Sequence, residues 1–355
     1  MEIRIKNRII GDNNPVFIIG EMAWSHDGSI ENAKKIIKAV SEAKGDAISI
    51  HITCMKEYMT KQYRGKTGIT ISDGKRQLSI YDYLEKINLK NEELADLFLF
   101  SKKLGLITCS QCNDLSSLKF SNEINPDIQV IAASCFIENN LVEQIAKTQK
   151  PIILRIGGAT LGEIENTISL IKENGNNKII LLHGIQMYPT NIEDTNISFI
   201  PTLKNLFSYP AGMADHTDAE TDIAGIIPLL AVTLGANAIE KHITYDRGKK
   251  GEDHESALNP REFKNLVSNV RLTEKALGQS SIVFSSPKER GYREVVRKKT
   301  VAKNDIHKNQ TIAPQLTSFK RADEGISPDE LRYFLGRKVK YKIKKDEGIT
   351  PEKLI

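Results

Sequence analysis

Short apolar runs alternate along residues 16–244 with longer stretches in which apolar positions recur every three to four residues. The first pattern is typical of buried strands and the second of amphipathic helices. The runs are almost continuously apolar, which indicates burial on both faces, as parallel strands require. We predict strands at residues 16–22, 47–52, 106–111, 128–134, 151–157, 178–184, 211–216 and 238–244. Eight such units favour a closed (β/α)8 TIM barrel over an open doubly wound sheet.

The helical stretches fall where the crossovers between parallel strands need them. We expect helices at residues 29–43, 91–104, 161–172, 219–234 and 260–277. The insertion at residues 55–88 is rich in Gly, Lys and Ser and is too long for a plain connection. We therefore expect it to form a lid or a substrate wall at the active end of the barrel.

The pattern changes after Gly278. A chain of 355 residues exceeds the usual size of a single core, so a second module is expected. We assign residues 1–278 to the barrel, residues 279–292 to a linker, and residues 293–355 to a small domain of short strands and turns. Because so small a domain buries little apolar area, we expect it to dock on the barrel or on a second subunit.

Composition excludes several classes of protein. The chain is 40% apolar and 27% charged, and no apolar run approaches the roughly 18 residues needed to cross a bilayer. Residues 1–10 lack the apolar core of a signal peptide, which predicts a cytoplasmic location and no membrane partner. The net charge of +5 includes lysines that gather near the C-terminus. Without aromatic residues interleaved in a binding motif, these predict a solvated basic face and no nucleic-acid site.

The four cysteines do not form a disulfide framework in a chain of this length. Cys109 and Cys112 have the spacing of half a zinc site, but no second pair and no neighbouring histidine accompany them. We interpret these two, with Cys54 and Cys135, as ordinary buried thiols.

Four of the predicted strands have polar side chains at their C-terminal ends, and this is the end of such a barrel where catalysis takes place. They are Glu21 on the first strand, His183 on the sixth, Asp215 and His216 on the seventh, and Glu240, Lys241 and His242 on the eighth. His216 and His242 would lie on adjacent strands, close enough to share one divalent ion with a carboxylate and water. Mn²⁺ suits such a mixed nitrogen and oxygen set and would polarise a sugar carbonyl. The alternative is that each is a hydrogen-bonded core histidine.

Two carboxylates have open roles at this stage. Glu21 could act as a general base, as an orienting group or as a structural residue. Asp253, in a loop after the eighth strand, is a surface carboxylate by default.

Four motifs together resemble the sialic acid synthase family. They are E-x-x-x-x-H-x-G-S at residues 21–29, LLH-x-x-x-x-YPT at 181–190, DHT at 215–217 and EKH-x-T at 240–244. The resemblance covers nearly the whole chain, because the family has a (β/α)8 barrel followed by an antifreeze-like (SAF) domain. The segments VVRKKTVAKNDI, FKRADEGI and EGITPEKL are similar to that domain.

The resemblance implies a metal-dependent condensation of an N-acyl amino sugar with phosphoenolpyruvate to give a nonulosonic acid. By motif, His216 and His242 would be the metal ligands, with Mn²⁺ or Mg²⁺ as the ion, and Glu21 would lie beside them. Tyr188 and Asp253 would contact the sugar side of the site, and Gln186 and Asp215 are also expected to bind substrate. Arg321 would reach the acyl group from a partner subunit, which implies a domain-swapped homodimer.

The positions that usually bind phosphoenolpyruvate depart from the family pattern. In place of the two usual lysines the chain has Ile50, before His51, and Val130. Ala133, Arg155 and Ala214 replace three serines, and Gln186 replaces an asparagine. Losing these groups should weaken the binding of an anion with about three charges by ~10³-fold or more. Arg155 could restore one cation, or could be a structural ion-pair partner.

Three functions follow from this mixed pattern. The first is a nonulosonate synthase in which Arg155 and lysines such as Lys56 or Lys61 rebuild the anion site. The second is a metal-dependent isomerase, epimerase, lyase or hydrolase that acts on a related sugar without phosphoenolpyruvate. The third is a non-catalytic binding relative, which the joint presence of Glu21, His216 and His242 disfavours.

Overall fold

A computed structural model of the chain describes residues 1–63, 78–278 and 286–355. The chain divides into two compact units, residues 1–278 and 279–355. None of its helices is long and apolar enough to cross a membrane.

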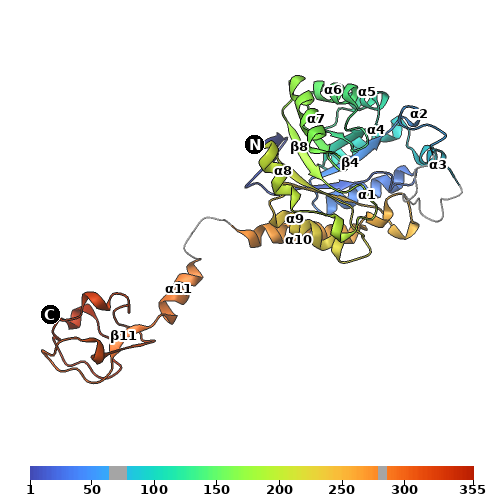
Figure 1. Cartoon of the computed structure of the whole chain (residues 1–355). Helices are drawn as coiled ribbons and strands as arrows, with labels where there is room; N and C mark the ends of the chain where they lie inside the picture. Colours follow the sequence, from blue (N-terminus) through green and yellow to red (C-terminus); the bar gives the residue numbers. More distant parts are fainter. Residues whose placement is uncertain (64–77, 279–285) are drawn as a thin grey trace. The chain divides into compact units, whose positions relative to one another are not determined.

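The first unit is the predicted barrel (Figure 1). Its strands pair in parallel and close in the order β10-β3-β4-β5-β6-β7-β8-β9. They are β3 (Phe17–Glu21), β4 (Ala47–Ile52), β5 (Ile107–Cys112), β6 (Ile128–Ile131), β7 (Ile152–Arg155), β8 (Ile179–His183), β9 (Ala211–Asp215) and β10 (Ala238–His242). All eight lie within or next to the predicted ranges, so the (β/α)8 fold is confirmed.

Helices surround the barrel and cover its outer face. They are α1 (Ile30–Glu42), α4 (Asn91–Lys103), α5 (Leu115–Ile124), α6 (Asn139–Lys147), α7 (Leu161–Glu173), α8 (Phe199–Phe207), α9 (Ile223–Thr233) and α10 (Pro260–Leu277). The prediction omitted α5, α6 and α8. Local capping sets several boundaries, as in α7, where Thr160 and Glu163 bond each other's backbone N–H groups.

An N-terminal hairpin closes the end of the barrel opposite the strands' C-terminal ends. Its strands are β1 (Ile3–Ile5) and β2 (Arg8–Ile10), and the sequence pattern did not reveal them. Ile3, Ile5 and Ile10 are buried in the same apolar cluster as the axial side chains Phe17 and Ile153. The barrel is therefore packed and plugged at this end, and its polar chemistry is confined to the other.

The insertion after β4 is partly described. It contains α2 (Met55–Tyr58) and α3 (Ile80–Ile87), while residues 64–77 lie outside the described part of the chain. Met55, Tyr81 and Leu84 form an apolar cluster with Trp24, which follows the first barrel strand. The insertion thus builds a wall beside the mouth of the barrel, and the prediction of a movable lid stays a prediction.

The second unit has its own small core. It contains α11 (Pro287–Val296) and the antiparallel pair β11 (Lys299–Ala302) and β12 (Thr317–Lys320). Ile306, Ile326, Val339 and Ile349 are among its buried residues. Residues 287–292, which we assigned to the linker, are helical because Ser286 and Glu289 form a capping box around Pro287.

The packed barrel axis predicts a clear stability contrast. Phe17→Ala should lower the free energy of unfolding of the barrel by about 3–5 kcal/mol, because it leaves a cavity among axial side chains. The control Leu99→Ala, at a 52% exposed position of α4, should change it by less than about 0.5 kcal/mol. Urea denaturation followed by near-UV circular dichroism measures both, and equal effects would contradict a packed axis.

Candidate active site

Strand alternation decides which polar side chains enter the barrel. Glu21 is paired in register with Ser49 on one side and His242 on the other, and all three share the inward direction. The same alternation turns Glu240, Gln111 and Arg155 inward. The mouth of the barrel is therefore lined by titratable and amide side chains above an apolar interior.

The two predicted metal ligands lie side by side at this mouth. The ring centroids of His216 and His242 are 5.2 Å apart, at an interplanar angle of 72°. The Tyr188 ring packs against both, with its centroid 4.4 Å from that of His216 and 5.5 Å from that of His242. Three aromatic rings, one from the loop after β8, one from the residue that follows β9 and one from the last residue of β10, therefore meet at one point.

Both imidazoles are suited to ligation. Burial lowers the pKa of His216 to about 4, and burial together with His216 holds the pKa of His242 well below its ordinary value, so both rings are neutral. His216 Nδ1 donates to the carbonyl of Ile185 at 2.7 Å, which leaves the Nε2 lone pair open. His242 Nδ1 is buried and has no hydrogen-bond partner among the described residues.

These observations fit a divalent ion that takes two protein nitrogens and completes its shell with oxygen from water or substrate. No group of three His, Cys, Asp or Glu residues in the described part of the chain has metal-binding geometry. The two imidazoles would therefore be the main protein contribution to such a site.

Arg155 crosses the barrel interior and pairs with two buried carboxylates. Its Nη2 donates to Glu240 Oε2 at 2.8 Å and also bonds Glu21 Oε2, while its Nη1 bonds Gln111. Burial would raise the pKa of Glu21, but the charges of Arg155 and His51 outweigh it and hold that pKa well below its usual range. Burial raises the pKa of Glu240 to about 7 against the pull of Arg155. Arg155 is thus an inward-facing residue whose charge is already balanced.

Three of the predicted substrate-binding side chains, those of Tyr188, Gln186 and Asp253, lie at the rim. The Tyr188 hydroxyl donates to Gln186 Oε1 at 3.0 Å. Asp253 keeps a 17% exposed side chain, with Oδ2 4.0 Å from His242 Nδ1. Burial raises the pKa of Asp253, and the nearby Glu252 and Glu21 raise it further. The rim therefore offers donors and acceptors next to the histidine pair.

The predicted substrate contact of Asp215 is wrong. Asp215 is in register with Lys241, so both side chains point away from the axis into the layer between barrel and helices. Lys241 Nζ donates to Asp215 Oδ2 at 2.7 Å, and both side chains are fully buried. Asp215 also accepts from the backbone N–H and hydroxyl of Thr217. It is a structural ion-pair residue that holds the turn after β9.

Arg321 lies in the second unit, directly after β12, and its side chain is exposed. Its predicted role in a neighbouring barrel stays a prediction.

Comparison with known proteins assigns the chain to a family. Residues 36–281 match the NeuB family and residues 300–355 match the SAF domain. The chain belongs to the NeuB family. This agrees with the predicted barrel followed by an antifreeze-like domain.

Similar proteins span almost the whole of this NeuB family chain. "Uncharacterized protein MJ1065" of Methanocaldococcus jannaschii is 34% identical over 100% of this chain and 99% of its own length. N,N'-diacetyllegionaminic acid synthase of Campylobacter jejuni is 32% identical over 94% of this chain and 98% of its own length. The solved structure of N-acetylneuraminic acid (sialic acid) synthetase from Leptospira borgpetersenii has 30% identity and a TM-score of 0.71, covering 83% of this chain and 97% of that chain.

The structure corrects one of the departures from the family pattern. Ile50 was predicted to stand where the second strand usually offers its lysine, but its side chain is buried in the outer cluster beneath the helices. The inward positions of this strand are Ser49 and His51, one residue to either side. Val130 and Ala214 do face the axis, as predicted. The inward side chains of β4 and β6 thus carry neither lysine.

Sequence reasoning missed His51 and Gln111 as site residues. His51 Nε2 lies 3.1 Å from Glu21 Oε1 and 2.8 Å from Gln111 Nε2, and its Nδ1 is buried without a partner among the described residues. Both residues stand one position before the end of their strands and share the inward direction of Glu21, so alternation from Glu21 through Ser49 could have identified them.

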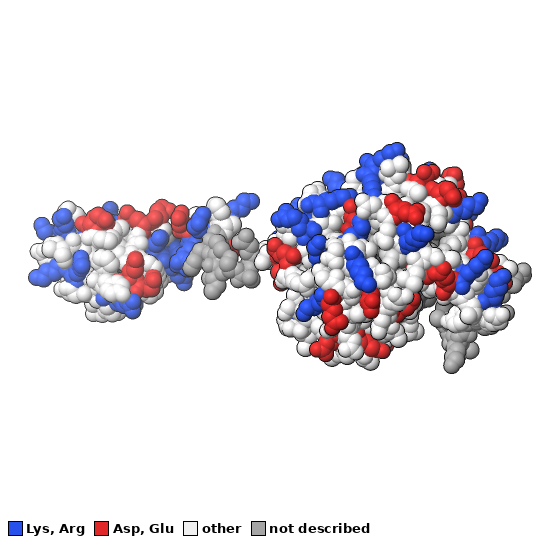
Figure 2. Space-filling model, turned by 90° about the horizontal axis from the view of Figure 1, so that it is seen from above, with Lys and Arg blue, Asp and Glu red and all other residues white. Residues whose placement is uncertain are grey.

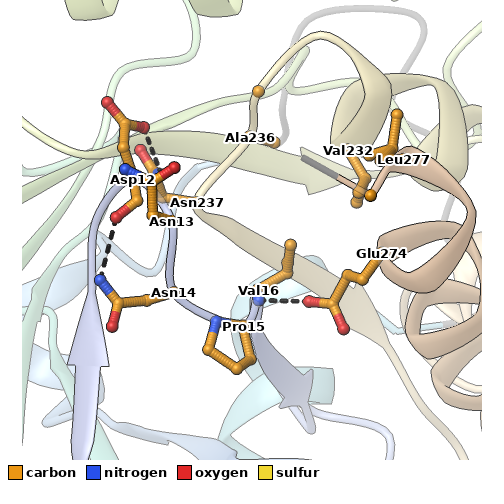
Figure 3. A pocket seen from close by; sticks show the side chains of 12 residues that line it. Asp12, Asn13, Asn14, Pro15, Val16, Val232, Ala236, Asn237, Glu274 and Leu277 are labelled. Carbon is orange, nitrogen blue, oxygen red and sulfur yellow. Dashed lines mark hydrogen bonds between the residues drawn. The ribbon is translucent and has the colours of Figure 1, made fainter. Parts of the chain in front are cut away.

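A separate pocket of about 360 Å³ lies at the opposite end of the barrel (Figure 3). Asp12, Asn237 and Glu274 line it, and their polar atoms are paired with one another, with backbone or with Lys204 and Arg271, as in the 3.0 Å bond from Asn237 Nδ2 to Asp12 Oδ1. It contains none of the predicted site residues. The barrel mouth, where buried polar atoms lack partners, is the better candidate.

The charge balance around Arg155 predicts a pH-dependent stability loss. Arg155→Met should lower the free energy of unfolding by roughly 3–5 kcal/mol at pH 8, because Glu21 and Glu240 are left as buried unpaired charges. The deficit should shrink toward pH 5. The unaltered protein keeps the stabilisation from the lowered pKa of Glu21 at both pH values, because both lie above the ordinary pKa of a glutamate. In the variant without Arg155, both buried carboxylates can take up protons as the pH falls, and their unpaired charges disappear.

Urea denaturation at the two pH values measures this effect. The control Lys38→Met breaks an exposed ion pair with Glu42 and should change stability by less than about 0.5 kcal/mol. An Arg155→Met deficit that is equal at pH 5 and pH 8 would contradict the charge-balance explanation.

Proposed function

We propose that this chain is a metal-assisted carbohydrate enzyme of the nonulosonate synthase type, acting on the open-chain carbonyl form of an N-acyl amino sugar. The observation that carries the proposal is the pair of neutral, facing imidazoles of His216 and His242, with Tyr188 and Asp253 beside them. Family membership and the synthase names of relatives support the reaction class.

The proposed cofactor is Mn²⁺ or Mg²⁺, held by His216 and His242. When bound there, such an ion would supply Lewis acidity to the sugar's carbonyl oxygen. The lowered pKa values of the two imidazoles support this role, because rings that stay neutral keep their lone pairs available.

The remaining residues bind and orient the sugar. Asp253 can accept a hydrogen bond from a hydroxyl, and Tyr188 and Gln186 can exchange their mutual bond for bonds to the substrate. Glu21 already accepts bonds from Arg155 and from the backbone N–H of Ala23. These partners favour an orienting role for Glu21 over that of a general base.

Two reactions are compatible with this proposal. Condensation with phosphoenolpyruvate or a related donor is the first, and the name of the Campylobacter relative, a synthase of a nonulosonic acid, supports it. A reaction of the sugar alone, such as isomerisation, epimerisation, cleavage or hydrolysis, is the second. The pairing of Arg155 with two carboxylates favours the second, because it leaves no surplus cation at the inward positions of the described strands.

We also propose that the chain works as a domain-swapped homodimer in which Arg321 contacts the sugar in a neighbouring barrel.

Basic and acidic side chains are mixed over the face shown in Figure 2, so no surface of a single sign on that face suggests a nucleic acid as partner.

The metal proposal predicts the behaviour of two single variants. His216→Ala and His242→Ala should each weaken Mn²⁺ binding by more than about tenfold, with a parallel loss of N-acetylmannosamine binding. Isothermal titration calorimetry measures both affinities, and the exposed His307→Ala in the second unit is the control. If the unaltered protein binds neither divalent metal nor sugar, the enzymatic proposal is wrong and a non-catalytic role is favoured.

The dimer proposal predicts that a substitution at Arg321 weakens sugar binding without unfolding the protein. Arg321→Ala should lower the affinity for an N-acyl amino sugar by about tenfold, since one charge-assisted hydrogen bond is lost, while the denaturation midpoint stays unchanged. Arg332→Ala, at another exposed position of the same unit, should have no such effect. A protein that is strictly monomeric by analytical ultracentrifugation and binds the sugar with unchanged affinity would exclude this role.

A further inference from the structure

We infer that the inner floor of the mouth, formed by Arg155, Glu240 and His51, binds an uncharged hydrogen-bonding group of the substrate, a hydroxyl or an amide, and selects against phosphate-bearing donors. Arg155 is in this view a specificity-determining residue. The inference rests on the proposed sugar site above it, and it deepens that proposal by identifying the class of ligand that the floor accepts.

First, the guanidinium of Arg155 is already hydrogen-bonded within the protein. Its two terminal nitrogens donate to Glu21, Glu240 and Gln111, and Nη2 also lies 3.4 Å from Ser49 Oγ. A phosphate would have to displace two carboxylates that are buried with the arginine. Such pairs are costly to break, because a lone buried charge is left behind.

The second step is the total charge of the floor. The inward side chains at this level include one permanent cation, Arg155, and two carboxylates, Glu21 and Glu240. The two carboxylates offset the charge of Arg155 together with that of a protonated His51. Lys241, the other fully buried cation of the described barrel, points outward and pairs with Asp215. A phosphate and carboxylate together carry about three negative charges, for which this floor offers no surplus positive charge.

The third step is the set of buried atoms without partners. Arg155 Nε, Glu240 Oε1 and His51 Nδ1 are all buried, and none has a hydrogen-bond partner among the described residues. Buried polar atoms of this kind require a ligand or water. Arg155 Nε–H can only donate and an ionised Glu240 Oε1 can only accept. A hydroxyl or an amide both donates and accepts, so it satisfies such a set, whereas a phosphate would set oxygen against oxygen at Glu240.

The structure therefore separates two zones of the mouth. The histidine pair with Tyr188 and Asp253 forms the outer zone, where the carbonyl end of the sugar is proposed to bind. The floor around Arg155 forms the inner zone, and its donor and acceptor atoms suit a further hydroxyl or the N-acyl amide of the same molecule.

The test removes one negative charge at a time. Glu240→Gln and Glu21→Gln each keep the shape of the side chain and remove one carboxylate charge that offsets the positive charge of Arg155. Binding of phosphoenolpyruvate and of inorganic phosphate is measured by calorimetry with and without Mn²⁺. Phosphate release is followed with N-acetylmannosamine and Mn²⁺ present.

We expect the unaltered protein to bind neither anion at millimolar concentration and to release no phosphate. Glu240→Gln should tighten phosphoenolpyruvate binding by about tenfold or more, because a repulsive charge at contact distance is gone. Glu21→Gln should act in the same direction. The control Glu262→Gln, which alters a remote ion pair with Arg247, should leave anion binding unchanged.

Tight phosphoenolpyruvate binding or phosphate release by the unaltered protein would overturn the inference. So would folded Glu240→Gln and Glu21→Gln variants that both fail to gain anion affinity; if only one of them folds, its result decides. The proposed function fails separately, through absence of Mn²⁺ and N-acetylmannosamine binding. A protein that binds metal, sugar and phosphoenolpyruvate would refute only the account of the floor.

Discussion

In a closed barrel of parallel strands, every second side chain faces the axis, and this alternation determines the chemistry of the molecule. It brings Glu21, Arg155, Glu240 and His242 into one space, and it turns Lys241 and Asp215 into the wall between strands and helices. The N-terminal hairpin seals the far end with apolar side chains. In the described part of the chain, the polar side chains that face the barrel axis therefore gather at the mouth.

The balance of charges at this mouth connects stability with specificity. Arg155 is stabilised by two carboxylates that would otherwise be unpaired, and the same pairing removes the arginine as a free anion-binding group. The histidine pair next to it stays neutral because it is buried beside other positive groups. The arginine that replaces a serine is thus held by two carboxylates beneath the histidine pair.

The sequence was sufficient for the fold and for the outer zone of the site. Parallel strands that are buried on both faces appear in the sequence as continuous apolar runs. His216 and His242 stand at the ends of two neighbouring runs, so the order of the strands predicted that they lie close together. Their proposed role as ligands still awaits a metal measurement.

The inner zone could not be predicted in the same way. Arg155 meets Glu21 across 134 residues of chain and Glu240 across 85, and no local pattern records such cross-barrel contacts. The errors at Ile50 and Asp215 share one cause, since a shift of a single residue along a strand exchanges the axial face for the outer face. The short hairpin at residues 3–10 was missed because two three-residue strands carry almost no periodic signal.

The proposed enzyme depends on two imidazoles from neighbouring strands that would hold one divalent cation beside a sugar. A crystal grown with Mn²⁺ and N-acetylmannosamine tests it most directly, through anomalous scattering at the manganese edge. The account predicts one strong peak bonded to a nitrogen of His216 and a nitrogen of His242, with sugar oxygens adjacent. An ordered mouth without that peak, or a peak held by other residues, would contradict it.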